Sequence, residues 1–367
     1  MKNILLAAGA LTAAASITYA GKIERRGDPS MILFEKGTNY VEVSAASVHP
    51  SVSGKPLPGI PAGGTGNIVK NYRSFAGGYK HELNDRVTLA FVLDEPVGAK
   101  VDYLTPGAFF SGSFATVDSI AFTGLAKYQA TDRFSVYGGL RYMGLSGEIG
   151  VISPATTGNP LLGPSPYSLS VNKDWQLGYL VGAAYEIPDI ALRVAVTYES
   201  KTEHDFKDNL GDPFEVEIPQ AVTIHAQTGI AANTLLFGSA RWREWTQFEV
   251  RPGDFFSFVP GVGPVNTPIA SGPSDIWTFE LGVGRRFNEN WSGAFIMGYE
   301  EDQGDVVGNL SGKDGFISYG LAASYENESI KITTGVKYFD VGDAKTSVTS
   351  FEDNDALAFG TKVAFKF

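Results

Sequence analysis

The chain has 367 residues, a formal net charge of −11 at pH 7, no cysteine and a mean hydropathy of −0.03. The acidic balance without a basic cluster argues against nucleic-acid binding, and the lack of cysteine excludes disulfides and cysteine-ligated metals. The mean hydropathy is too low for a bundle of membrane-spanning helices, whereas the alternating residues of a membrane β-barrel average to such a value.

The first twenty residues predict a secretory signal peptide. Lys2 precedes the apolar run 4–17, and the small-x-small pattern Thr18-Tyr19-Ala20 follows it. An apolar run of this length is too short to cross a bilayer as a helix. We therefore predict that residues 1–20 are removed on export and that residues 21–367 form a single domain.

The start of the mature chain has no β-strand pattern. Residues 22–28 are mostly polar and charged, and Pro29 leads into a short apolar stretch. We interpret residues 21–38 as a short plug segment that lies inside or under a barrel formed by residues 39–367.

After residue 39 the chain shows repeated alternation of apolar and polar residues, which indicates β-strands with one apolar face. The fourteen predicted strands are 40–48, 74–82, 87–95, 119–128, 134–145, 174–186, 191–203, 217–229, 235–248, 275–287, 291–302, 316–325, 330–340 and 355–367. We therefore predict an all-β chain, a fourteen-stranded antiparallel transmembrane β-barrel with a short N-terminal plug.

The last strand is the clearest of the fourteen. Leu357, Phe359, Val363, Phe365 and Phe367 share one face, and the opposite face is small or charged. Strands of globular proteins usually have about 5–6 residues, whereas a tilted membrane-spanning strand needs roughly 9–11. A long final strand that ends on Phe resembles the terminal signature that the assembly machinery of bacterial outer-membrane barrels recognises.

The connections alternate between tight and long. The tight turns are 83–86, 129–133, 187–190, 231–234, 288–290 and 326–329, and the long loops include 49–73, 96–118, 146–173, 251–274 and 303–315. Outer-membrane barrels have this arrangement, with short periplasmic turns and long extracellular loops. Aromatic residues near the predicted strand ends would form two girdles at the lipid headgroups.

Apolar residues in the long loops are candidates for ligand capture, because loops that face water usually lack such clusters. The candidates are Phe109, Phe110, Leu161, Leu162, Phe255, Phe256 and Phe258. The alternative is that these loops pack on one another and cap the barrel.

Three arginines are predicted to point into the lumen and could bind the carboxylate of a fatty acid: Arg141, Arg193 and Arg241. A guanidinium binds a carboxylate through two parallel charge-assisted hydrogen bonds. The alternative for each is an ion pair with a lumenal carboxylate such as Glu199 or Glu280.

An enzymatic function would have to use one of the four histidines, His49, His81, His204 or His225. The pair His204-Asp205 could imitate a base and its orienting group, but adjacent residues of a strand point to opposite faces. We therefore predict no catalytic activity, no cofactor and no metal site.

The order of several segments resembles the FadL/TodX family of long-chain fatty acid and hydrocarbon transporters of the bacterial outer membrane. The segments are Asp28-Pro29-Ser30-Met31 leading into 37–48, the exit His49-Pro50-Ser51-Val52-Ser53-Gly54, and 94–103, 192–203 and 240–248. The resemblance implies a plugged barrel, ligand capture by extracellular loops and exit through a gap where the third strand is kinked.

Pro96 and Gly98 are the candidate lateral gate, since proline lacks a ladder donor and glycine weakens a strand. The alternative is that Pro96 only ends the third strand. We thus expect an outer-membrane monomer that takes up hydrophobic small molecules and contacts lipid, lipopolysaccharide and the assembly machinery. The alternative function is a general diffusion porin for small hydrophilic solutes.

Overall fold

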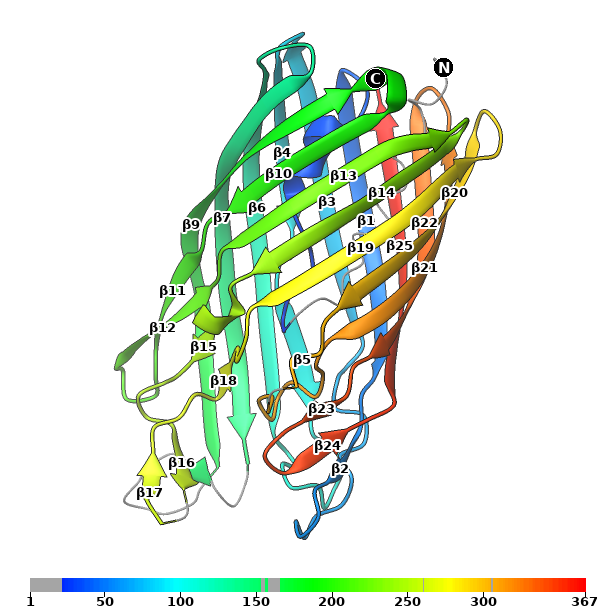
Figure 1. Cartoon of the computed structure of the whole chain (residues 1–367). Coiled ribbons are helices and arrows are strands. Elements are labelled where there is room, and N and C mark those ends of the chain that lie inside the picture. The colour runs from blue at the N-terminus through cyan, green and yellow to red at the C-terminus, as the bar shows by residue number, and fades with distance from the viewer. Residues whose placement is uncertain (1–21, 153–155, 158–165, 260, 305) are drawn as a thin grey trace.

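A computed structural model describes residues 22–152, 156–157, 166–259, 261–304 and 306–367. Its strands form one closed antiparallel barrel (Figure 1), and the predicted count of fourteen is confirmed when β4 and β5 are taken as one interrupted strand. The barrel strands are β1 (Asn39–Ser51), β3 (Tyr72–Asn84), β4 (Val87–Asp94) with β5 (Gly98–Asp102), β6 (Phe114–Gln129), β7 (Phe134–Val151), β9 (Tyr167–Ile187), β10 (Leu192–Glu199), β13 (Ala221–Ala231), β14 (Thr234–Arg243), β19 (Ile276–Arg286), β20 (Trp291–Glu300), β21 (Phe316–Glu326), β22 (Ile330–Val341) and β25 (Asn354–Lys366).

The remaining elements belong to the turns, the loops and the N-terminal segment. They are β2 (Gly54–Pro56), β8 (Thr156–Thr157), β11 (Thr202–Lys207), β12 (Pro213–Ile218), β15 (Glu249–Val250), β16 (Phe256–Val259), β17 (Gly263–Val265), β18 (Ala270–Ser271), β23 (Ala344–Lys345), β24 (Thr349–Phe351), and the 3-10 helices η2 (Pro29–Phe34), η3 (Pro188–Ile190) and η4 (Trp245–Gln247). In Figure 1 the C-terminus and the tight turns lie at the upper end of the barrel, and the small loop sheets lie at the lower end.

Closure of the barrel joins the two ends of the chain. β1 pairs with β25 over twelve residues, from Tyr40 opposite Lys366 to Ser51 opposite Asp355, and β4 pairs with β6. In hydrocarbon every backbone N–H and C=O group needs a partner within the protein, so a membrane sheet has to close.

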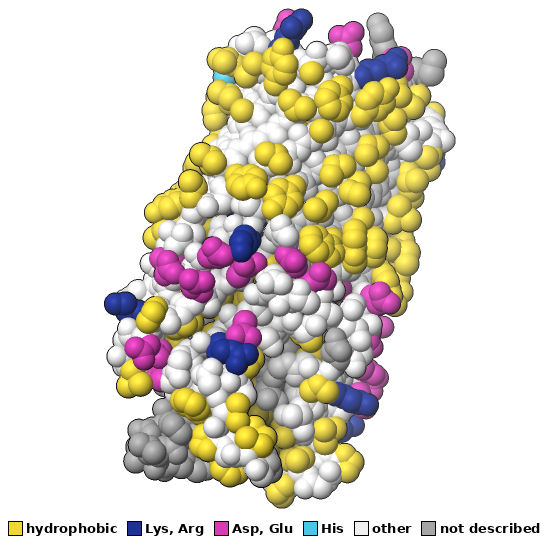
Figure 2. Space-filling view, turned by 60° about the vertical axis from the view of Figure 1, so that its left-hand side comes forward, with side chains coloured by type: hydrophobic (Ala, Val, Ile, Leu, Met, Phe, Trp, Pro, Cys, Tyr) yellow, Lys and Arg dark blue, Asp and Glu magenta, His cyan; other side chains and the backbone are white. Residues whose placement is uncertain are grey.

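The side chains of β25 alternate as its sequence predicts. Phe359 and Phe365 are 48% and 46% exposed on the outer surface, whereas Ala356, Ala358 and Ala364 are fully buried on the inner face. Figure 2 shows the outward apolar side chains as a broad band over the barrel, bordered by acidic and basic side chains toward the loop end. An apolar band limited by charged residues is the surface expected of a transmembrane β-barrel.

Several predicted strand boundaries were wrong toward the loop end. β9 has 21 residues and begins at Tyr167 rather than at 174, and the predicted strand 191–203 is divided into β10 and β11. The predicted strand 235–248 ends at Arg243, and η4 follows it. At this end the strand limits depend on loop packing: Tyr167 and Leu169, at the start of β9, are buried in an apolar cluster with loop residues.

None of the helices in the described residues is long and apolar enough to cross a membrane.

The closed barrel predicts a characteristic behaviour in detergent. We expect a β-type circular dichroism spectrum and a folded form that migrates differently from the boiled protein on a gel. The reason is that the hydrogen-bonded sheet closes on itself and has no edge at which unfolding can begin. A protein that stays dispersed in buffer without detergent would contradict this assignment.

Candidate functional site

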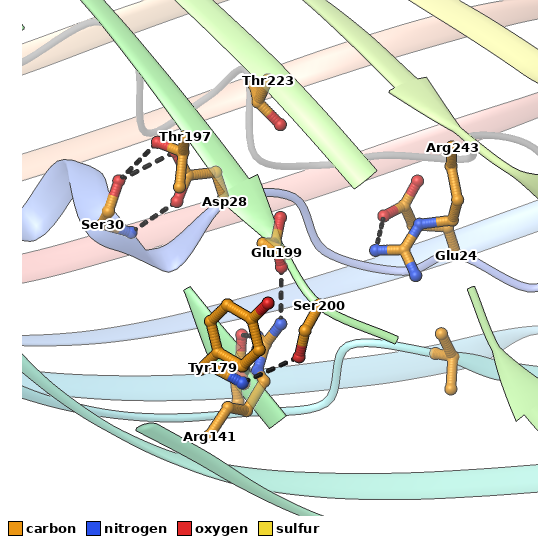
Figure 3. Close-up of polar contacts among 12 residues, drawn as sticks. Glu24, Asp28, Ser30, Arg141, Tyr179, Thr197, Glu199, Ser200, Thr223 and Arg243 are labelled. Atoms are coloured by element: carbon orange, nitrogen blue, oxygen red, sulfur yellow. Dashed lines mark hydrogen bonds and ion pairs between the residues drawn. The ribbon is translucent and has the colours of Figure 1, made fainter. Parts of the chain in front are cut away.

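The N-terminal segment runs through the barrel and is anchored to the inner faces of its strands. The Asp28 side chain caps η2 by accepting a hydrogen bond from the Ser30 backbone N–H at 2.8 Å. The same carboxylate accepts a hydrogen bond from Thr197 of β10 at 2.6 Å (Figure 3). It also lies 3.5 Å from His225 of β13. One acidic residue therefore starts the helical turn and fixes it to the wall.

The other end of η2 is held by cations and by apolar packing. Phe34 lies between Lys127 and Arg193, whose charged groups are 4.8 and 4.7 Å from its ring centre. Glu35 forms ion pairs with Lys331 at 3.2 Å and Lys362 at 3.4 Å. The segment thus contacts strands that are far apart around the barrel circumference.

A chain of alternating charges crosses the lumen beyond η2. Arg141 binds Asp94 at 3.0 Å and Glu199 at 2.8 Å, and Arg241 binds Glu199 at 2.6 Å and Glu24 at 2.8 Å. Arg243 completes the chain at 3.0 Å from Glu24, as Figure 3 shows. Three guanidinium groups are therefore matched by three carboxylates, and Glu24 joins the N-terminal segment to this network.

The three predicted ligand-binding arginines all lie inside the barrel, and each has a partner from the protein. Arg141 and Arg241 share Glu199, which is one of the carboxylates that the sequence offered as an alternative partner. Arg193 donates to Gln227 at 3.0 Å in addition to its contact with Phe34. To bind a ligand, each arginine would have to exchange or share these contacts.

The third barrel strand is interrupted rather than ended. β4 stops at Asp94 and β5 starts at Gly98, yet both pair with β6. On the other edge β3 pairs with β4 only as far as Gly77 opposite Leu93, and β5 has no pairing with β3 among the described residues. We call the unpaired stretch between residues 72–76 and 95–99 the wall break.

The N-terminal segment supplies partners for the backbone at the wall break. The N–H groups of Arg25 and Arg26 donate to the Pro96 carbonyl at 2.9 and 3.2 Å, and the Gly98 N–H donates to the Ile23 carbonyl at 2.7 Å. On the β3 side, the Phe75 N–H donates to a Glu95 carboxylate oxygen at 3.3 Å. The freed hydrogen-bonding groups therefore have protein partners, as an interruption at membrane depth requires.

The side chain of Arg25 fills the space beside Gly98. A Cβ atom at this position would lie 2.3 Å from Cζ of Arg25, so the guanidinium occupies the space that a side chain would need. The same guanidinium lies 4.6 Å from the ring centre of Tyr72, at the end of β3. Arg25 thus lies between the two sides of the wall break.

Two cavities meet near Glu24. The wall cavity has a volume of about 110 Å³ and is lined by Lys22–Arg25, Val69, Tyr72, Gly98–Val101, Phe248, Ile269–Ser271, Gly308, Leu310, Ser311 and Lys313. The lumen cavity has a volume of about 190 Å³ and extends from Glu24 along η2 to Glu35, Glu42 and Lys362 on one side and to β14 and β19 on the other. The wall cavity includes residues of both edges of the wall break.

The candidate aromatic residues of the loops fall into two separate groups. Phe109 and Phe110 pack with Tyr103 in one apolar cluster, whereas Phe255 belongs to another and contacts Tyr167 edge to face at 5.0 Å. Neither group lines the wall cavity or the lumen cavity.

Two of the other loop candidates lie on a short strand of the outer loops. Phe256 and Phe258 lie on β16, where Phe258 is 47% exposed. Leu161 and Leu162 lie outside the described residues. For all the loop candidates, the alternative to ligand capture was that the loops pack on one another and cap the barrel.

The histidines form no arrangement for catalysis among the described residues. His204 is buried on β11, 3.3 Å from Asp174 rather than beside Asp205, and His225 faces Asp28 in the lumen. No group of three or more potential metal-ligating side chains occurs in the described part of the chain.

From the sequence, the N-terminal segment with Arg25, Arg26 and Asp28 was expected to supply hydrogen-bond partners at the lateral gate, and the backbone of Arg25 and Arg26 does so. The sequence did not identify Tyr72 and Lys313 as residues of a site, because a segment without periodicity gives no information about which wall residues it contacts. Lys313 follows a long loop, and its position depends on how that loop folds back over the barrel.

The structure is a closed barrel with an apolar exterior, a charged lumen and a segment of its own chain inside. These features define a transmembrane β-barrel of the outer-membrane type. The family model described as outer membrane protein transport protein (OMPP1/FadL/TodX) matches residues 27–292. The chain belongs to this family, whose members are membrane transporters of hydrophobic compounds and not enzymes. No curated protein matched the sequence.

Solved structures with the same fold include transporters of this family. A FadL homologue from Pseudomonas aeruginosa superimposes with a TM-score of 0.74 at 15% identity, covering 98% of both chains. The toluene transporter TodX of Pseudomonas putida gives 0.66 at 11% identity, covering 93% of this chain and 92% of its own. The toluene transporter TbuX of Ralstonia pickettii gives 0.63 at 13% identity over the whole of both chains. At these identities the likeness shows the fold.

Proposed function

We propose that the protein takes up hydrophobic small molecules, such as long-chain fatty acids or hydrocarbons, and releases them sideways into the outer membrane. The observation that carries the proposal is the wall break, because β5 and β3 leave an unpaired stretch at the place where a cavity reaches the wall. In this mechanism Pro96 and Gly98 form the lateral gate. The outer loops, including the aromatic residues 109, 110, 255, 256 and 258, capture the ligand.

The position of the wall cavity favours the sideways route for an apolar ligand. Burial of each CH₂ group away from water stabilises a ligand by about 0.8 kcal/mol, so a hydrophobic molecule is more stable in lipid than in water. Both cavities are lined by apolar and charged side chains, but the wall cavity includes residues of both edges of the wall break. A ligand that leaves there enters lipid without crossing the ion-pair network of the lumen.

Four further expectations stay predictions. They are export after removal of residues 1–20, assembly by the outer-membrane machinery, contact with lipopolysaccharide, and a monomeric state. The predicted signal peptide, residues 1–20, lies outside the described residues.

A paired assay separates this function from that of a diffusion porin. We expect liposomes that contain the protein to show no rapid swelling with small sugars, because the charge network and the N-terminal segment cross the lumen. Cells that express the protein are expected to accumulate labelled decanoate or labelled toluene faster than cells without it. Rapid swelling without uptake of either hydrophobic compound would favour the porin.

A further inference from the structure

Two buried carboxyl groups lie close together in the loops, away from the lumen. Asp208 is in the turn between β11 and β12, Asp254 is in the loop before β16, and each is only 6% exposed. Figure 1 shows these elements toward the lower end of the barrel. Asn209 joins the two segments, because its backbone N–H and its side-chain amide both donate to Asp254, at 3.3 and 2.9 Å. Neither carboxyl group lines the lumen cavity or the wall cavity.

This buried pair has no counter-charge from the protein. Neither carboxyl group takes part in an ion pair within 4.0 Å among the residues that the structure describes. The cations next to them along the chain point elsewhere, since Lys207 is exposed and Arg251 is paired with Glu249. Burial of unpaired carboxylates is strongly unfavourable, and buried charges in proteins are normally paired or coordinate a metal ion.

One oxygen of the pair has no hydrogen-bond partner. Oδ1 of Asp208 accepts hydrogen bonds from the backbone N–H groups of Leu210 and Asp212, both at 2.9 Å. Oδ2 of the same carboxyl group is buried without a partner. It faces Gly253, the residue before Asp254, where a Cβ atom would lie only 3.2 Å from it. The free oxygen therefore points toward the loop that carries the second carboxyl group, and the glycine leaves the space beside it open.

Asp254 also keeps accepting capacity. Its Oδ1 atom accepts a hydrogen bond from the Tyr167 hydroxyl at 2.6 Å, and its Oδ2 atom accepts the two from Asn209. A carboxylate has about four lone-pair sites, so these three hydrogen bonds leave one of them free.

The free groups of the pair are carboxylate oxygens, which are the ligands of hard cations. Calcium accepts irregular sets of carboxylate, carbonyl and water oxygens, whereas magnesium demands a nearly ideal octahedron. Two carboxylates also balance the charge of one divalent ion. The chemistry of the pair therefore fits calcium better than magnesium or a transition metal.

We propose that Asp208 and Asp254 bind a calcium ion that ties the turn of the β11–β12 hairpin to the loop before β16. Oδ2 of Asp208 and the free site of Asp254 are the charged ligands, and water completes the coordination. The ion lies beside the edge-to-face contact of Tyr167 with Phe255, so it stabilises the apolar packing of these loops.

Calorimetry with calcium chloride tests the site on the full-length protein in a non-ionic detergent, after treatment with a chelator. We expect a Kd of about 0.1–1 mM, the range of extracellular calcium modules. Asp208→Asn and Asp254→Asn are each expected to weaken binding at least about ten-fold, because each removes a charged ligand. Gly253→Ala is expected to weaken binding with both charges intact, since its methyl group enters the space beside the free oxygen of Asp208.

Terbium luminescence gives a second readout, one that a purely structural role of the pair would not produce. Tb³⁺ replaces Ca²⁺ at oxygen sites and is excited through a tyrosine close to the ion, and the Tyr167 hydroxyl donates to Asp254. We expect tyrosine-excited emission from the unaltered protein, its displacement by calcium, and loss of most of it in Tyr167→Phe while calorimetry still detects calcium.

Asp205→Asn is the matched control, because it neutralises an exposed carboxyl group of the same hairpin and should leave the affinity unchanged. Heat-modifiable gel migration shows that each variant is assembled, and Gly253→Ala carries the test if Asp208→Asn does not assemble. No calcium binding up to about 10 mM, ten-fold above the expected range, would overturn the site. Unchanged affinity in an assembled Asp208→Asn would do the same. Either result would leave hydrophobic transport intact, because the pair lines neither cavity.

Discussion

Uptake of hydrophobic ligands is expected to fall by at least about ten-fold when the wall break is sealed by Pro96→Val together with Gly98→Thr. The two changes provide a backbone donor at residue 96 and a β-branched side chain at residue 98, so the stretch from β4 to β5 can pair continuously with β3. Each restored ladder hydrogen bond contributes ~0.5–1.5 kcal/mol, and two of them suffice for such an effect if passage requires the wall to open.

The new side chain at residue 98 has a second consequence. The introduced threonine would displace the guanidinium of Arg25, which now fills that space. Uptake by whole cells is the measurement, and Pro56→Val in β2 is the matched control, because it removes a proline from an outer-loop strand. If the sealed variant is assembled and takes up ligand at the normal rate, the ligand passes by another route, and the lumen cavity is the alternative.

Glu199→Gln is expected to destabilise the folded barrel by roughly 3–5 kcal/mol, since it leaves buried guanidinium groups without their shared carboxylate. Arg141 and Arg241 bind the two oxygens of Glu199 at 2.8 and 2.6 Å, and the side chains of all three residues are nearly excluded from solvent. Urea-induced unfolding in lipid vesicles, followed by gel mobility, measures the effect.

Glu203→Gln is the matched control for this prediction. Glu203 lies a few residues further along the chain on β11, and its ion pair with Lys201 is about half exposed on both sides. An exposed ion pair contributes little, because water and salt already screen its charges. Equal destabilisation by the two substitutions would show that the lumen is hydrated well enough to solvate unpaired arginines.

The alternation of apolar and polar residues along the sequence was sufficient to predict the barrel architecture. Period-2 alternation is a property of neighbouring residues, so the outward face of Leu357, Phe359 and Phe365 could be assigned without any tertiary information. The alternation of tight and long connections then indicated which end of each strand faces which side of the membrane. The lumenal position of Arg141 followed from the same parity. The parity of the strand that contains Arg241 was ambiguous and was chosen because the reverse would place two arginines toward lipid, at up to ~2–4 kcal/mol each near the midplane.

The contacts of the site could not be predicted in the same way. Arg141 and Glu199 are 58 positions apart and meet because β7 and β10 curve around a closed barrel. Which carboxylate an arginine meets depends on strand register and stagger, and both are set by closure of the whole sheet. Sequence reasoning could therefore offer Glu199 only as one alternative.

What the sequence by itself determined is a fourteen-stranded membrane barrel of the FadL/TodX family with a polar segment at its N-terminal end. Only the tertiary structure decided that this segment crosses the lumen, that Pro96 interrupts the third strand without ending it, and that Arg25 lies in the break beside Gly98 and Tyr72. The physical reason is that alternation is a short-range signal, whereas a chain segment without periodicity acquires its position from the charges and spaces of the wall around it.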